Sequence, residues 1–202
     1  NARETGAVAV SLRARARQPY GGSASGSIDF GAVALTRWEE KMMRSGIGFD
    51  THRLVAHRKL ILGGVEIPHE VGLLGHSDAD VLTHAIMDAL LGAVAAGDIG
   101  QHFPDSDARW EGADSVFLLR EVMAILRRRG WRPVNVDATV LAERPKLMPY
   151  LPEMRCRLAH AMGLAVEAVS VKATTVEGLG AIGRREGISA MAVATVCPEA
   201  DA

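Results

Sequence analysis

The sequence has little of what marks a secreted, membrane-spanning or nucleic-acid-binding protein. It contains two cysteines in 202 residues, Cys156 and Cys197, far apart and outside any C-x-x-C pattern. We therefore expect neither a disulfide scaffold nor a cysteine-ligated zinc site, and we expect a reducing, cytoplasmic location. The 23 basic residues are balanced by 24 acidic ones, which leaves no excess positive charge to neutralise a nucleic-acid backbone.

Aromatic residues and long apolar runs are also scarce. Aromatics make up 4% of the chain although hydrophobic residues make up 48%, so the core is expected to consist mainly of Ala, Val, Leu, Ile and Met. The longest apolar stretch, residues 89–96, is interrupted by Gly92 and is far too short to span a bilayer. The composition is that of a globular domain with no membrane and no nucleic acid among its partners.

The composition changes near residue 42. Residues 1–41 contain alternating Arg and Ala and a Gly/Ser stretch, without a sustained hydrophobic period, and are expected to form a poorly ordered extension. Three origins stay open for it: a transit peptide, which would make the location a plastid, the tail of an upstream fused domain, or translated sequence ahead of a start at Met42 or Met43. Residues 42–202 are expected to form one domain.

Strand and helix patterns alternate along that domain. Ser77 is expected to cap the first helix and Gly97 to end it. The alternation predicts an α+β fold in which a mixed β-sheet is covered by helices on one face. The expected strands are residues 44–51, 59–67 (a strand pair turning at Gly63-Gly64), 134–141, 169–175 and 188–196, and the expected helices are residues 79–95, 113–129 and about 149–162.

One group of polar residues has the spacing of a metal site. Asp50 and His52 lie two positions apart on an expected strand, so their side chains point to the same face. Asp80, His84 and Asp88 follow one another at intervals of four, which places them on one stripe of a helix. The strand pair and His84 supply three ligands and leave a fourth position open, as in a catalytic zinc site. Asp80 or Asp88 would then orient the imidazole of His84. A solvated acidic face with a half-exposed histidine fits the spacing equally well.

Other loops carry residues suited to phosphate. Ser77 stands at an expected helix N-terminus, where free N–H groups attract anions. Residues 97–105 form a loop rich in Gly, Asp and Pro, and Lys146 lies in a loop bounded by prolines. Residues 174–177 place two threonines next to a glutamate, which suits a phosphate–metal cluster. Taken singly, each pattern is also that of an ordinary cap, turn or strand end.

Together, these segments stand in a recognisable order. They include Gly48-Phe49-Asp50-Thr51-His52, Gly75-His76-Ser77-Asp78, Gly97-Asp98-Ile99-Gly100, Gly112-Ala113-Asp114-Ser115, Pro145-Lys146, Val171-Lys172-Ala173-Thr174-Thr175 and Gly183-Arg184-Arg185-Glu186-Gly187. Over residues 44–196 the chain resembles the 2-C-methyl-D-erythritol 2,4-cyclodiphosphate synthase family of the non-mevalonate isoprenoid pathway. The resemblance implies a metal-dependent phosphorus–oxygen lyase that closes a cyclic diphosphate on a cytidylyl substrate and releases CMP. It also implies a homotrimer whose sheets face the threefold axis.

The resemblance also assigns residues. It implies one divalent metal per subunit, zinc, on Asp50, His52 and His84, and a second ion, Mg²⁺ or Mn²⁺, on Glu177. It gives the stabilisation of the transition state to His76 and Thr175. The substrate-binding residues that it implies, in a site shared by two subunits, are Asp50, His52, His76, Ser77, Asp98, Gly100, Phe103, Asp105, Ala142, Lys146, Leu147, Met148, Thr174, Thr175, Glu177, Ala181 and Arg184.

Two positions depart from the family pattern. Ala181 stands where many members carry an aromatic residue, and Gly178 where a polar side chain is common. The aromatic residue lines an axial cavity of the trimer that can hold an isoprenoid diphosphate. Arg184 and Glu186 match the polar ring of that cavity, so phosphate capture is expected, whereas Ala181 leaves the enclosure of the isoprenoid tail open. A metal-dependent phosphoesterase and a non-catalytic trimeric binding module stay as alternative functions.

Overall fold

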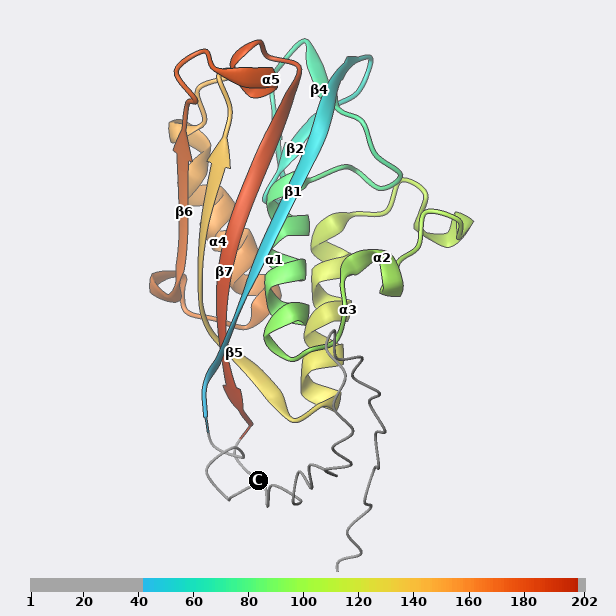
Figure 1. The fold of residues 1–202 in the computed structure, drawn as a ribbon, viewed down its shortest axis with the longest axis vertical. Coiled ribbons are helices and arrows are strands. Elements are labelled where there is room, and N and C mark those ends of the chain that lie inside the picture. Colours follow the sequence, from blue (N-terminus) through green and yellow to red (C-terminus); the bar gives the residue numbers. More distant parts are fainter. Residues whose placement is uncertain (1–41, 200–202) are drawn as a thin grey trace, which may run out of the picture. The chain divides into compact units, whose positions relative to one another are not determined.

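The computed structural model describes residues 42–199. Its main element is a five-stranded sheet with the strand order β4-β1-β7-β5-β6 (Figure 1). β5 and β6 pair in parallel and the other neighbours are antiparallel, so the sheet is mixed, as predicted. The expected poorly ordered extension over residues 1–41 lies outside the described residues. The strands are β1 (Arg44–Ala56), β4 (Val71–Leu73), β5 (Trp131–Leu141), β6 (Val169–Thr174) and β7 (Gly187–Pro198), and a separate hairpin consists of β2 (Leu60–Leu62) and β3 (Val65–Ile67).

The helices cover one face of this sheet, which confirms the predicted α+β architecture (Figure 1). The three long ones are α1 (Val81–Ala93), α3 (Ser115–Arg128) and α4 (Leu151–Met162). The short elements are α2 (Ile99–His102), α5 (Gly180–Gly183) and the 3₁₀ turns η2 (Ala108–Trp110), η3 (Met148–Tyr150) and η4 (Val166–Ala168). Within residues 42–199, no helix has the length and apolar character needed to cross a membrane.

The other face of the sheet exposes large apolar side chains from the adjacent strands β1 and β7. Ile47 and Phe49 of β1 are 65% and 56% exposed, and Met191 and Val193 of β7 are each 43% exposed. The strand register pairs Ile47 with Val193 and Phe49 with Met191, so the four form one continuous patch. We refer to these four residues as the apolar sheet face. An apolar surface of this kind on a sheet is typical of a protein interface.

Glycines let β1 lie directly against α1. A Cβ atom added at Gly46 would lie 2.1 Å from the carbonyl oxygen of Ala89, and one at Gly48 would lie 1.9 Å from that of Ala85. Any side chain at these positions would push the helix away from the strand. Because Asp50 and His52 follow Gly48 on β1, this contact fixes how close they come to α1.

Both ends of α1 differ from the sequence-based prediction. The cap is Asp80, not Ser77: the Asp80 carboxylate accepts hydrogen bonds from the Thr83 amide at 3.0 Å and the Thr83 hydroxyl at 2.7 Å. It also accepts from the amides of Gly63 and Gly64 at 2.9 and 2.7 Å, so it ties the β2–β3 hairpin to the helix. Ser77 lies before this point, in a turn where its hydroxyl accepts from the Ala79 amide.

The helix also ends earlier than Gly97. It ends at Ala93, and the amides of Ala95 and Ala96 donate back to the carbonyls of Gly92 and Leu91. Ala95 takes the left-handed conformation, with φ of 51°, that glycine usually takes at this place. The prediction from Gly97 was wrong because a tolerated alanine closes the helix two residues before it. The expected ends of α3 and α4 at Gly130 and Gly163 are correct to within two residues.

Replacing Asp80 by alanine should lower the free energy of unfolding by about 2–4 kcal/mol, because four donors lose one buried acceptor. Asp114 provides the matched control. It caps α3 through the amides of Val116 and Phe117 but is itself exposed. Asp114→Ala should therefore cost only about 1 kcal/mol. Urea denaturation of both variants checks this, and equal losses would contradict the role given to the buried cap.

Candidate metal centre

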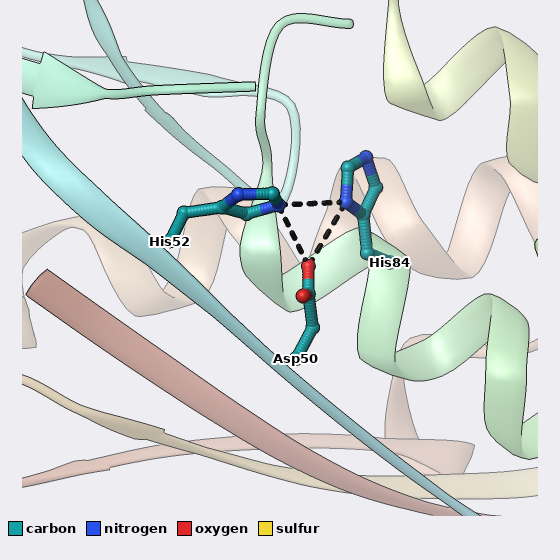
Figure 2. A group of neighbouring side chains, drawn as sticks. All are labelled: Asp50, His52 and His84. Carbon is teal, nitrogen blue, oxygen red and sulfur yellow. Dashed lines mark hydrogen bonds and ion pairs between the residues drawn. The ribbon is translucent and has the colours of Figure 1, made fainter. Parts of the chain in front are cut away.

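Asp50, His52 and His84 converge on one point, as their spacing predicted (Figure 2). The first two side chains project from β1 and the third from α1. Asp50 Oδ2 lies 2.9 Å from His52 Nε2 and 3.0 Å from His84 Nδ1, and the two nitrogens are 3.2 Å apart. His84 is buried, while the other two side chains are about one-fifth exposed, so the centre opens toward solvent on one side.

A chain of hydrogen bonds sets the tautomer of His84. The Ser115 hydroxyl donates its proton to Asp78 Oδ1, and the Ser115 amide donates to Asp78 Oδ2 at 3.0 Å. The hydroxyl can therefore only accept from His84 Nε2, which lies 3.0 Å away. His84 consequently carries a proton on Nε2, and its Nδ1 faces Asp50 Oδ2 and His52 Nε2. This is the arrangement in which an imidazole binds a metal while its other nitrogen is held in place.

The donor set fits a divalent transition metal. Burial by itself would raise the pKa of the Asp50 carboxyl, but the hydrogen bonds with His52 and His84 outweigh it and hold that pKa well below its usual range. Burial would lower the pKa of His84, and the hydrogen bond and charge of Asp50 outweigh it and raise that pKa. One carboxylate and two imidazoles form the donor set that Zn²⁺ prefers, with a fourth position left for a ligand. A metal there would displace the proton that Asp50 otherwise draws to Nδ1.

The two aspartates expected to orient His84 do not touch its imidazole. Asp80 is occupied as the cap of α1, and Asp88 accepts a hydrogen bond from the Ile99 amide at 2.8 Å. The groups beside His84 Nε2 are the hydroxyls of Ser115 and of Ser77, the latter at 3.1 Å. Ser115 is 31 positions from His84, so helical spacing could not reveal it. The motif at residues 112–115 was the one sequence signal that could have identified Ser115.

The remaining residues expected near the metal centre lie on neighbouring loops. His76 is half-buried, with Nε2 at 3.3 Å from the Asp107 carbonyl oxygen. Asp98 caps α2, Gly100 lies within it, and Asp105 is exposed. Phe103 packs edge-on against Trp110, with ring centroids 5.1 Å apart. Ser77 does not stand at a helix N-terminus, so the expectation that free helix amides there attract phosphate was wrong.

A second group of expected residues gathers where β5 and β6 end. The Ala142 amide donates to the Thr174 carbonyl at 3.0 Å, and the Thr175 hydroxyl donates to Glu177 Oε1 at 2.6 Å. Sequence reasoning missed Glu143, which accepts hydrogen bonds from two backbone amides of this loop. No hydrogen bond or ion pair within residues 42–199 joins these side chains to the metal trio.

The four residues expected around the nucleotide do not all face one way. Ala142 and Leu147 are buried, while Lys146 and Met148 are exposed. Lys146 lines a cavity of about 580 Å³ together with Arg144 and Arg185, and none of the other three expected residues contributes to its lining. Among the residues expected to line the axial cavity, Ala181 is exposed in α5, and Arg184 Nε donates to Glu186 Oε1 at 2.7 Å.

The fold and the trio define an α+β domain with a candidate metal centre built from one aspartate and two histidines. The model of the YgbB family matches residues 43–197, and the chain belongs to that family. The 2-C-methyl-D-erythritol 2,4-cyclodiphosphate synthase of Syntrophomonas wolfei is 60% identical over 154 residues, which cover 76% of this chain and 98% of that relative.

Solved structures show the same fold. The bifunctional IspDF of Campylobacter jejuni superposes with a TM-score of 0.76 at 39% identity, over 78% of this chain and 43% of that longer one. The CDP complex of IspF from Plasmodium falciparum superposes with a TM-score of 0.69 at 31% identity, over 78% of this chain and 97% of that one.

Replacing Ser115 by alanine should weaken Zn²⁺ binding by about 10- to 100-fold, because His84 Nε2 loses the acceptor that fixes its orientation. Competition with a chromogenic chelator measures the affinity. Ser45→Ala is the matched control, since Ser45 is exposed and its hydroxyl hydrogen-bonds to that of Thr195, away from the trio. Equal zinc affinity in both variants would show that Ser115 does not orient the histidine.

Proposed function

We propose that the chain converts 4-diphosphocytidyl-2-C-methyl-D-erythritol 2-phosphate to 2-C-methyl-D-erythritol 2,4-cyclodiphosphate and releases CMP, in the non-mevalonate isoprenoid pathway. The observation that carries this proposal is the complete Asp50–His52–His84 trio in a chain 60% identical to a synthase of that name across nearly its full length. Incubating the protein with this substrate and detecting CMP tests it. Release of inorganic phosphate instead would indicate a phosphoesterase, and no reaction would favour a binding module.

The chemistry requires no nucleophile from the protein. The 2-phosphate of the substrate attacks the β-phosphorus of the diphosphate, a new P–O bond closes the ring, and the bond to CMP breaks. The protein must bring two anionic groups together and offset their charge, so positioning and electrostatic stabilisation supply the catalysis. No residue of the trio has to give up an electron pair to carbon or phosphorus.

The trio would hold zinc, and Glu177 would hold the Mg²⁺ or Mn²⁺. Bound there, the two cations supply positive charge that neutralises and polarises phosphate oxygens. A single carboxylate with the remaining ligands drawn from substrate phosphates is a usual binding mode for Mg²⁺, so the lone Glu177 is sufficient. Thr175 now donates its hydroxyl proton to Glu177 and could turn it toward a phosphate oxygen. His76 would donate a hydrogen bond to the same developing charge.

The other proposed contacts can be grouped by the part of the substrate that they would bind. The loop of Lys146 would bind the cytidine, and the Thr174 segment would bind the diphosphate. Residues around α2 would bind the ribose and the erythritol. In full, the proposed substrate contacts are Asp50, His52, His76, Ser77, Asp98, Gly100, Phe103, Asp105, Ala142, Lys146, Leu147, Met148, Thr174, Thr175, Glu177, Ala181 and Arg184.

We further propose a homotrimer in which each active site lies between two subunits and the sheets face the threefold axis. The apolar sheet face supports this assembly, because an exposed patch of this kind is stabilised by burial. Within residues 42–199, no hydrogen bond or ion pair joins the trio to the nucleotide and diphosphate loops, which supports a site shared between subunits. At the axis, Arg184 and Glu186 would form the polar ring of a cavity for an isoprenoid diphosphate.

The proposed location is the cytoplasm. Both cysteines are free, Cys156 exposed and Cys197 half-buried, which suits a reducing compartment.

His84→Ala should abolish CMP release and zinc binding together while leaving the trimer folded, because the core around α1 is apolar and does not depend on the imidazole. His160→Ala, at the exposed end of α4, is the control and should keep both. Zinc content by mass spectrometry, CMP release and gel filtration check this. Full activity in zinc-free His84→Ala protein would contradict the metal assignment.

Lys146→Ala should lower kcat/KM by about one to two decades, because a charge-assisted contact to the substrate is lost. Zinc content should stay unchanged. The control is Lys59→Ala, since Lys59 is also exposed and pairs with Glu66 on the neighbouring hairpin strand. A fall in zinc content without a rise in KM would contradict the assignment of Lys146 to nucleotide binding.

A mixture of the inactive His84→Ala and the strongly impaired Lys146→Ala variants tests the shared site. Trimers that combine Lys146→Ala and His84→Ala subunits contain some sites with an intact trio from one subunit and an intact lysine from the next. Random assortment at equal concentrations should restore about a quarter of the wild-type activity. If mass spectrometry confirms subunit exchange and no activity returns, each site lies within one subunit.

A further inference from the structure

We propose that Glu143 is a positioning residue that clamps the loop carrying Thr175 and Glu177. One oxygen of its carboxylate, Oε1, accepts hydrogen bonds from the amides of Val176 and Gly178 at 3.0 and 3.1 Å. These two amides lie on either side of Glu177. The geometry of the clamp is independent of the activity, whereas its catalytic consequence rests on the proposed function.

The clamp offsets an unfavourable backbone conformation. Glu177 has a φ of 53°, in the left-handed region that residues with a Cβ rarely adopt. Gly178 follows with a φ of 77°, and a glycine adopts such a conformation without cost. A loop with this combination would relax if its ends were free. The bonds to Glu143 hold the residue before and the residue after Glu177, so they retain the conformation at the residue that needs it.

Glu143 is itself held by the sheet. β5 and β6 pair in parallel up to Leu141 and Thr174, and the Ala142 amide continues the ladder with a bond to the Thr174 carbonyl. Glu143 therefore leaves the end of β5 beside the point where the 175–178 loop leaves β6. α5 also packs against the loop, since a Cβ added at Gly183 would lie 2.0 Å from the carbonyl carbon of Gly178.

The clamp sets the directions of two groups that would meet the substrate. The Thr175 hydroxyl donates to Glu177 Oε1 at 2.6 Å, so both side chains are aligned before any ligand arrives. Within the described residues, no lysine or arginine forms an ion pair with Glu143. Two backbone amides stabilise the half-buried carboxylate instead, so its role is to hold the backbone rather than to bind the substrate.

Two substitutions separate positioning from a direct role. Glu143→Gln keeps an oxygen that can accept both amide bonds but removes the negative charge. Glu143→Ala removes both. A residue that acts only through the loop should be rescued by glutamine, whereas a metal ligand or a charged substrate contact should not. Glu153→Ala is the control, because Glu153 is an exposed glutamate on α4 that pairs with Arg157.

The experiment uses the full chain and three measurements. Amide hydrogen exchange by NMR reports on Val176 and Gly178 directly. Electron paramagnetic resonance measures Mn²⁺ binding in the presence of CDP, and steady-state kinetics measures CMP release. Glu143→Ala should lose protection at both amides, bind Mn²⁺ about tenfold more weakly and lose about 10- to 100-fold in kcat/KM. Glu143→Gln should stay within about threefold of wild type in all three measurements, with zinc content unchanged.

The failures are distinguishable. Unchanged protection and Mn²⁺ binding in Glu143→Ala would overturn the clamp, even if the wild-type protein releases CMP. Equal loss in Glu143→Gln and Glu143→Ala would overturn positioning in favour of a direct role of the charge. A wild-type protein that releases no CMP would refute the proposed function, while the exchange of the two amides would still decide whether Glu143 holds the loop.

Discussion

The close contact between β1 and α1 is the constraint on which the rest of the structure depends. The carbonyl oxygens of Ala85 and Ala89 occupy the space that side chains at Gly48 and Gly46 would need. The strand and helix can therefore approach closely enough for ligands from both to meet around one point. A Cβ at Gly48 would move the helix outward, and His84 would move away from Asp50 with it. The geometry of the candidate metal centre is thus set by backbone packing before ligand chemistry.

Two acids beside this contact, Asp80 and Asp78, have separate tasks. Asp80 joins the β2–β3 hairpin to α1, while Asp78, two residues earlier, fixes Ser115 and through it the tautomer of His84. Burial raises the pKa of the Asp80 carboxyl, and the nearby charge of Asp78 raises it further, so this arrangement has an electrostatic cost. The four donors around Asp80 offset that cost. Stability and metal orientation are therefore linked within one short segment.

Local periodicity was sufficient to predict the long elements and to suggest the trio, but not the groups that support it. The two-residue spacing of Asp50 and His52 fixes a shared face wherever a strand forms, so this pair could be proposed from the sequence. Ser115 could not, because it reaches His84 only after α3 packs beside α1. The choice of Asp80 over Ser77 as cap likewise depends on Gly63 and Gly64, which donate from a distant hairpin. Sequence-distant donors decided each of these outcomes.

The division of the site within one chain gives the proposed assembly a physical purpose. The metal trio is preformed by β1 and α1, and the phosphate loop is preformed by Glu143 at the ends of β5 and β6. Burial of the apolar sheet face would supply the free energy that brings a trio from one copy to a loop from the next. Rigid halves are then an advantage, because few side chains and loops lose conformational freedom when two copies associate and complete the site.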